Sequence, residues 1–193
     1  MNKKTYILGT LVLLSLVAIG VTYAAFSDKG KVLGSTFSIG SGDIKLLRDI
    51  ASGIQEENLA DDISGPSFSD IGPNWEARYN LKVFNNATSP VTVSTNANYD
   101  TANDPDELRQ IIYIEPLEWN DINEDGLVDS NEEGVSLGKK TIVKWKTEGF
   151  FLGQINSGEI KSLILIFSTE SIPSSKQGAS AIFDFVIDAI QIE

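Results

Sequence analysis

Apolar and polar residues alternate with a period of two along much of this chain. The alternation is clearest over residues 76–83. The apolar positions there are Ala77, Tyr79, Leu81 and Val83, and the polar ones are Glu76, Arg78, Asn80 and Lys82. This period predicts a strand with one face in the core and the other in water. Residues 89–99 continue the alternation after Asn85 and Asn86, which predicts an antiparallel hairpin.

Further along the chain, four runs are rich in β-branched and aromatic residues. They cover residues 108–119, 139–145, 161–169 and 181–192. Each run is short and β-branched, which favours strands over helices. Only residues 104–110 are expected to form a short helical turn, because Pro105 is tolerated near a helix start.

The segment over residues 51–73 differs from these runs because it is acidic and rich in turn residues. We expect it to wrap the same domain as a loop or as short edge strands. The pattern as a whole predicts an all-β fold, a two-sheet β-sandwich of jelly-roll or immunoglobulin-like type, as a single domain over residues 26–193.

The N-terminus has the composition of an export signal. Lys3 and Lys4 precede an apolar stretch over residues 6–21, and small residues follow it. This order predicts an N-terminal signal helix that a peptidase removes. The alternative is an anchor that stays in place, since the apolar stretch approaches the roughly 20 residues that a membrane span needs. The small residues and the acidic Asp28 that follow favour cleavage.

Motifs at both ends of the chain resemble the TasA/camelysin family. At the N-terminal end they are Tyr23-Ala24-Ala25-Phe26-Ser27-Asp28, the pair Thr36-Phe37 and the turn Gly42-Asp43-Ile44, and at the C-terminal end "FDFVIDAIQ". The resemblance implies that a SipW-type signal peptidase cuts between Ala25 and Phe26. Residues 1–25 would then be the signal peptide and Phe26 the mature N-terminus.

The most specific chemical signal is the segment over residues 121–132, which matches the EF-hand loop at every diagnostic position. The expected metal ligands are Asp121, Asn123, Asp125, the backbone carbonyl of Leu127, Asp129 and Glu132. Gly126 stands where the loop turns sharply. Oxygen donors without histidine or cysteine favour Ca²⁺. The flanking residues read as strands, so we expect a calcium-binding loop inserted into the sandwich, with a structural role.

A solvated acidic turn is the alternative reading of this loop. Seven carboxylates and no basic residue lie between Glu118 and Glu133. Their mutual repulsion would keep the loop open without a cation, which favours calcium.

Composition excludes several functions. The chain has 27 acidic and 15 basic residues and a net charge of −12, so nucleic acid is a poor partner. Contact with a membrane is expected only through an uncleaved signal segment. The family resemblance would suggest a camelysin-like metallopeptidase, but the sequence has no histidine and no cysteine. A HExxH zinc site and a thiol nucleophile are therefore excluded, and we expect no enzyme.

The segment after the expected cut, residues 26–40, contains Phe26, Val32, Leu33, Phe37 and Ile39 but also three glycines and several small polar residues, so alone it makes a weak strand. The family resemblance implies that this arm fills the sandwich of the next copy, giving a head-to-tail homopolymer by donor-strand exchange. We therefore expect a secreted structural subunit of extracellular or biofilm-matrix fibres, stabilised by calcium. A monomeric cell-surface adhesion module that binds calcium is the alternative, and a camelysin-like metallopeptidase is the third possibility.

Overall fold

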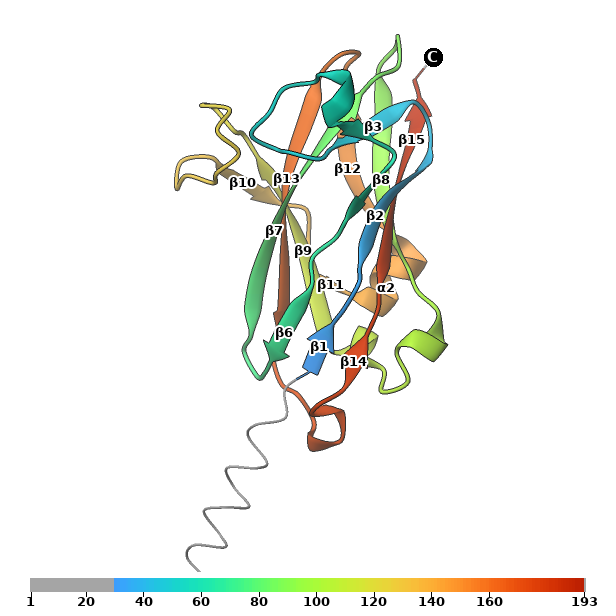
Figure 1. Ribbon diagram of the computed structural model, residues 1–193, viewed down its shortest axis with the longest axis vertical. Helices are drawn as coiled ribbons and strands as arrows, with labels where there is room; N and C mark the ends of the chain where they lie inside the picture. Colours follow the sequence, from blue (N-terminus) through green and yellow to red (C-terminus); the bar gives the residue numbers. More distant parts are fainter. Residues whose placement is uncertain (1–29, 193) are drawn as a thin grey trace, which may run out of the picture.

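The computed structural model describes residues 30–192, and nearly all of their regular structure is β-strand (Figure 1). In the largest sheet, the order is β10 (Glu133–Ser136), β9 (Ile112–Trp119), β13 (Ile160–Thr169), β7 (Glu76–Asn85), β3 (Ile44–Leu47) and β4 (Leu59–Ala60), with β11 (Lys140–Thr141) paired to β9. A five-stranded sheet has the order β12 (Phe150–Ile155), β8 (Val91–Asn98), β15 (Asp184–Gln191), β2 (Thr36–Ser41) and β5 (Asp62–Ser64). A small third sheet has the order β14 (Ser180–Ala181), β1 (Gly30–Val32) and β6 (Phe68–Ile71). The predicted all-β fold is confirmed.

The two larger sheets pack on each other through aromatic side chains. Phe37 of β2 stacks on Tyr79 of β7 with ring centroids 5.2 Å apart. Phe185 of β15 contacts Phe167 of β13 at 6.0 Å. Because each contact joins a strand of one sheet to a strand of the other, the apolar faces of both sheets form one core.

One helix, α2 (Ile142–Glu148), lies where the sequence predicted a strand over residues 139–145, so that prediction was wrong. The Thr141 hydroxyl accepts a hydrogen bond from the Lys144 amide and caps the helix start, and Gly149 ends it with a φ of +62°. Ile142 and Trp145, three residues apart, are both fully buried. Burial of this helical face outweighs the β-preference of the branched residues.

The predicted hairpin between β7 and β8 was also wrong. β7 pairs with β13 and β3 in one sheet, whereas β8 pairs with β12 and β15 in the other. The buried Asn85 side chain donates to the carbonyls of Ser89 and Ile155. It thereby fixes a longer connection that crosses from one sheet to the other, where a tight two-residue turn would have kept both strands in one sheet.

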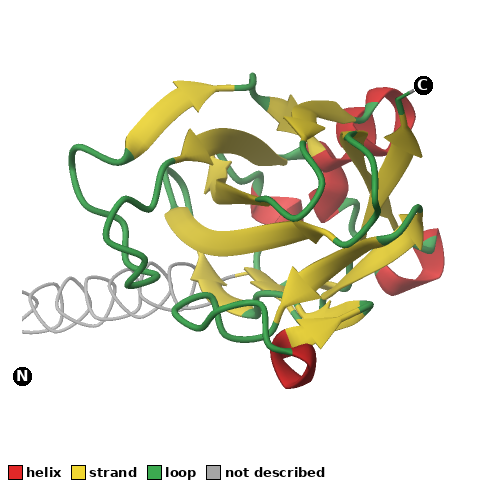
Figure 2. Cartoon of the chain, turned by 90° about the horizontal axis from the view of Figure 1, so that it is seen from above, coloured by secondary structure: helices red, strands yellow, loops and turns green. Residues whose placement is uncertain are grey.

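The segment over residues 51–73 contains the short strands β4, β5 and β6, each at the edge of its sheet. Short 3-10 turns occur at Glu56–Asn58, Thr101–Asn103, Leu108–Gln110 and Ser174–Lys176. The third of these falls within the predicted helical turn over residues 104–110. Seen from above, a loop that joins β9 to β10 projects away from the sheets at the left (Figure 2).

The N-terminal strands β1 and β2 pair with strands far away in the sequence. β1 runs parallel to β14 and antiparallel to β6, and β2 runs parallel to β15 and antiparallel to β5. The described chain therefore begins as a strand inserted between its C-terminal strands and residues 62–71. The expected signal segment, and the cut between Ala25 and Phe26, lie outside the described residues. Within residues 30–192, no helix is long and apolar enough to cross a membrane.

Candidate functional site

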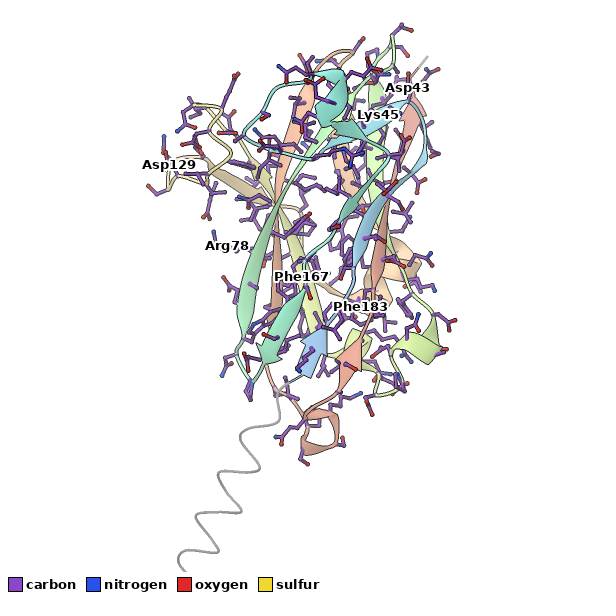
Figure 3. The ribbon with its side chains drawn as sticks, viewed as in Figure 1. Asp43, Lys45, Arg78, Asp129, Phe167 and Phe183 are labelled. Atoms are coloured by element: carbon purple, nitrogen blue, oxygen red, sulfur yellow. The ribbon has the colours of Figure 1, made fainter. Side chains whose placement is uncertain are left out.

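The predicted calcium loop leaves β9 after Trp119 and rejoins the sheet on β10 at Glu133. These two residues are opposite each other in the antiparallel register. Next to them, the Asn120 amide donates to the Glu132 carbonyl at 3.0 Å, which closes the base of the loop. The loop carries Asp129 to the outer edge of the molecule (Figure 3). The site is therefore an excursion between two paired strands.

Three of the predicted ligands gather at the tip of the loop. The Asn123 amide nitrogen lies 3.1 Å from an oxygen of Asp125 and 3.5 Å from an oxygen of Asp129. The Asn123 oxygen accepts a hydrogen bond from the Asp125 amide at 3.2 Å. A half-turn of the Asn123 amide about its terminal bond would give up this hydrogen bond and direct the oxygen at the same place. The side chains at loop positions 3, 5 and 9 can therefore face one cation.

Leu127, whose carbonyl is the expected ligand at position 7, follows this tip. Its side chain is 66% exposed, and its amide donates to the Asp125 carboxylate at 2.7 Å. The backbone of position 7 is thus tied to the carboxylate of position 5. This contact leaves the Leu127 carbonyl as a candidate ligand.

Asp121, at position 1, is held on the inner side of the loop. One of its oxygens, Oδ2, accepts hydrogen bonds from the Lys82 ammonium at 2.5 Å and from the Gly126 amide at 3.2 Å. The other, Oδ1, is buried without a hydrogen-bond partner, and the side chain is only 3% exposed. A buried carboxylate oxygen without a partner is costly and is satisfied by a bound cation or water.

Gly126 has the sharp backbone turn that the loop pattern requires. Its φ is +75°, and a Cβ there would lie 2.9 Å from the Ala51 nitrogen. A side chain at this position would strain the backbone and push the loop away from residue 51. Glycine thus lets the loop turn and also pack against the segment over residues 49–54.

Glu132, at position 12, is 3% exposed and is bound by donors of the loop itself. Its oxygens accept hydrogen bonds from the amides of Asp129 and Ile122 and from the indole of Trp119, at 3.0–3.2 Å. The Asp129 amide is the main cause that lowers the pKa of Glu132 below its usual value. The indole of Trp119 therefore lies under the loop and ties its last residue to β9.

The six predicted ligands therefore fall into two groups. Asn123, Asp125 and Asp129 meet at the tip, with Leu127 beside them, whereas Asp121 and Glu132 are bound to other donors. Within residues 30–192, no three acidic side chains are close enough, as placed, to hold a metal. The donor set fits Ca²⁺ in kind, but a complete shell requires Asp121 and Glu132 to turn towards the tip.

Sequence reasoning missed one member of the site, Lys82. The two-residue period placed it on the wet face of β7, but it is only 6% exposed. Its ammonium also lies 5.2 Å from the centre of the Trp119 ring. No local signal marks this position, because Lys82 is covered by segments that are distant in the sequence.

Basic residues from neighbouring strands pair with three of the seven carboxylates between Glu118 and Glu133. Lys82 pairs with Asp121, Lys161 with Glu118 at 2.9 Å, and Arg78 with Glu133. The lack of basic residues within the loop therefore does not by itself require a bound cation. The fold itself supplies part of the neutralising charge.

A cavity of about 420 Å³ lies between this loop and residues 51–54. Lys82, Trp119, Asp121 and Glu124 are among the residues that line it. The buried ion pair therefore has a space beside it into which a side chain can move.

Comparisons with known proteins give no family. No protein-family model and no curated protein matches the chain. Among solved structures, the chain is similar to an ASH/PapD-like domain, PapD-like domain 7 of human CEP192, at 12% sequence identity and a TM-score of 0.24. The match covers 64% of this chain and 78% of that one. Such a low score supports no inference about function.

Proposed function

We propose that this chain is a secreted structural subunit of extracellular fibres. Copies would join head to tail by exchange of the N-terminal strand, and calcium in the loop over residues 121–132 would stabilise the subunit. A SipW-type peptidase cut between Ala25 and Phe26 would free the exchanged arm, residues 26–35. The resemblance of both chain ends to the TasA/camelysin family supports this proposal together with the position of β1.

The observation that carries the proposal is how β1 is attached. It is a strand of three residues, held between β14 and β6. The amides of Lys31 and Leu33 donate to the carbonyls of Ala179 and Ala181, both at 2.9 Å. Val32 is the buried apolar residue at the centre of the strand, 4% exposed. Removal of β1 would leave a slot with unpaired backbone groups on both sides, which a strand from another copy can fill.

Gly34 separates this strand of three residues from β2, a strand of six residues. It has a φ of +63°, and no atom lies within 4 Å of the place where its Cβ would be. Beyond it, Thr36 donates to the Asp184 carboxylate, and the buried Phe37 contacts Phe185 at 4.8 Å. β1 can therefore swing out at Gly34 while β2 stays in its own sheet.

Donation of β1 from each copy to the next produces an open chain. The arm and the slot are different surfaces, so the contact is heterologous and does not close on itself unless a ring forms. In the described residues the slot is filled by the chain's own β1. We therefore propose an exchange, in which the same strand changes its acceptor.

A disulfide that locks β1 in place tests the exchange. Lys31 and Ser180 are exposed and opposite each other in the parallel register, and the chain has no native cysteine. Adjacent strands lie about 4.8 Å apart, within the range that a disulfide spans. In the mature chain with Lys31→Cys and Ser180→Cys, we expect filaments by electron microscopy under reducing conditions and none after oxidation.

A second cysteine pair controls for the disulfide itself. Ser94 of β8 and Phe151 of β12 are opposite each other in the other large sheet and do not belong to the arm. Oxidation of Ser94→Cys with Phe151→Cys should leave filament formation unchanged. Filaments from the oxidised β1 lock would disprove strand exchange.

The alternative, a monomeric calcium-binding adhesion module at the cell surface, has one observation in its favour. β1 is paired within its own chain, so the described fold is complete without a neighbour. This alternative predicts that the unmodified mature chain stays monomeric in light scattering at high concentration with calcium. The fibre proposal predicts growth of the particles.

We propose no catalytic activity. The lack of histidine and cysteine in the sequence supports this view, as does the position of the acidic cluster on a projecting loop. A zinc-dependent turnover of peptide substrates by the purified mature chain would contradict it.

A further inference from the structure

We infer that Lys82 is an internal counter-cation of the loop. Its ammonium holds Asp121 when calcium is absent, and it weakens calcium binding because it competes for the same carboxylate. The competition rests on the calcium site of the proposed function. The role of Lys82 in the metal-free chain does not depend on that site.

The contact between the two side chains is buried and direct. The Lys82 ammonium lies 2.5 Å from Oδ2 of Asp121, and the two side chains are 7% and 3% exposed. The Gly126 amide donates to the same oxygen. The pair therefore fixes the first residue of the loop to β7 and to the turn at residue 126.

The second oxygen of Asp121 leaves this carboxylate with a free acceptor. Oδ1 is buried and has no hydrogen-bond partner. It is thus an acceptor that Lys82 does not satisfy, on a carboxylate that is the first expected ligand of the loop. A cation bound through Oδ1 would lie beside the Lys82 ammonium on the same carboxylate group.

Two cations on one carboxylate repel each other. The repulsion between a unit charge and a double charge a few ångströms apart lowers the calcium affinity roughly tenfold, even at a water-like dielectric constant. The Lys82 ammonium lies over the Trp119 ring, and Lys82 lines the cavity of about 420 Å³. Calcium can therefore bind by displacing the ammonium into this space, but only with a loss of affinity.

Other cations near the loop do not have this position. Lys161 pairs with Glu118 and Arg78 with Glu133, and neither carboxylate is an expected ligand. Both pairs are also more exposed than the Lys82 pair. Lys82 is thus the basic residue that sets the affinity of the loop, and it favours the weak binding that suits calcium-rich surroundings.

Calorimetric titration of the mature chain with CaCl₂ tests this inference on four proteins. They are the unmodified chain, Lys82→Met, Lys82→Arg and Lys161→Met. We expect Lys82→Met to bind calcium roughly tenfold more tightly, because it keeps the apolar stem and removes the charge. Lys82→Arg should stay near the unmodified affinity, and so should the matched control Lys161→Met. Equal or weaker binding by Lys82→Met would disprove the competition.

Unfolding by urea in the presence of a chelator tests the metal-free role separately. Lys82→Met should unfold at a lower urea concentration than Lys161→Met, since it leaves Asp121 buried without its partner. Equal midpoints would disprove this role. If Lys82→Met does not fold, Lys82→Gln replaces it, because its amide can still donate to Asp121.

The combined results separate the two ideas. If neither the unmodified chain nor any variant binds calcium, the calcium part of the proposed function and the competition both fail, and the urea experiment decides the metal-free role. If the unmodified chain binds calcium and Lys82→Met binds no more tightly, the proposed site stands and the competition fails.

Discussion

The interior of the sandwich and the outer face of β7 are both buried, but by different means. Between the sheets, Trp145 is fully buried and stacks on Phe185 with ring centroids 4.7 Å apart. Outside the large sheet, Lys82 and Asp121 are almost as buried, yet they form an ion pair under a loop. The first region is apolar and the second is charged.

The difference shows how each region depends on its partners. An apolar side chain gains from leaving water whatever its exact neighbours are. A buried charge loses its hydration and recovers the loss only if a specific partner is in place. The stability of the outer face of β7 should therefore fall sharply when one partner of the Lys82–Asp121 pair is removed, although this face lies outside the apolar core.

The largest expected effect belongs to the interior. Trp145→Ala removes the stacking on Phe185, the contact with Phe150 and the hydrogen bond from the indole to the Thr95 carbonyl at 3.0 Å. We expect the free energy of unfolding to fall by about 3–5 kcal/mol. Urea unfolding followed by circular dichroism measures it. A loss below about 1 kcal/mol would contradict the burial of this side chain.

A smaller effect is expected for the buried ion pair. Asp121→Ala leaves the Lys82 ammonium without its partner, and the metal-free chain should lose about 3 kcal/mol of unfolding free energy. The double variant with Lys82→Met should lose clearly less than the sum of the two single variants, because neither charge remains to be left unpaired. Additive losses in this double-mutant cycle would show that the two residues do not interact.

The smallest effect concerns Asp49, beside the loop. A hydrogen bond from the Ser52 hydroxyl is the main cause that lowers the pKa of Asp49 below its ordinary value of 3.8, and the Ala51 amide adds to it. A lowered pKa in the folded state stabilises the fold above that ordinary value, and this stabilisation is lost as the pH falls through the folded pKa.

Asp49→Asn should therefore be less stable than the unmodified chain at pH 7, and the difference between their urea midpoints should shrink below about pH 4. Unfolding curves between pH 2 and 7 measure this difference. A difference that stays constant over this range would mean that the Asp49 charge contributes nothing. Because Asp49 lies at the surface, only a shift of the midpoint is expected.

Local patterns in the sequence were sufficient for several features. The two-residue period over residues 76–83 predicted a strand that extends to Asn85 in the structure, and the β-branched runs predicted β9, β13 and β15. These predictions succeed because strand formation and short-range contacts depend on neighbours along the chain.

Contacts between distant segments decided the rest. The side chain of Asn85 holds the connection that crosses from the sheet of β7 to the sheet of β8. The burial of Ile142 and Trp145 stabilises a helix where the residue types favour a strand. The N-terminal strands β1 and β2 take their partners from residues 180–188 and 62–71. None of these partners can be read from a local period.

The sequence by itself determined the all-β class and the spacing of the expected oxygen ligands over residues 121–132, because both depend only on the order of neighbouring residues. Only the tertiary structure decided that Lys82 is buried against Asp121. A strand period assigns each residue to a face, but whether that face meets water depends on which distant segments cover it.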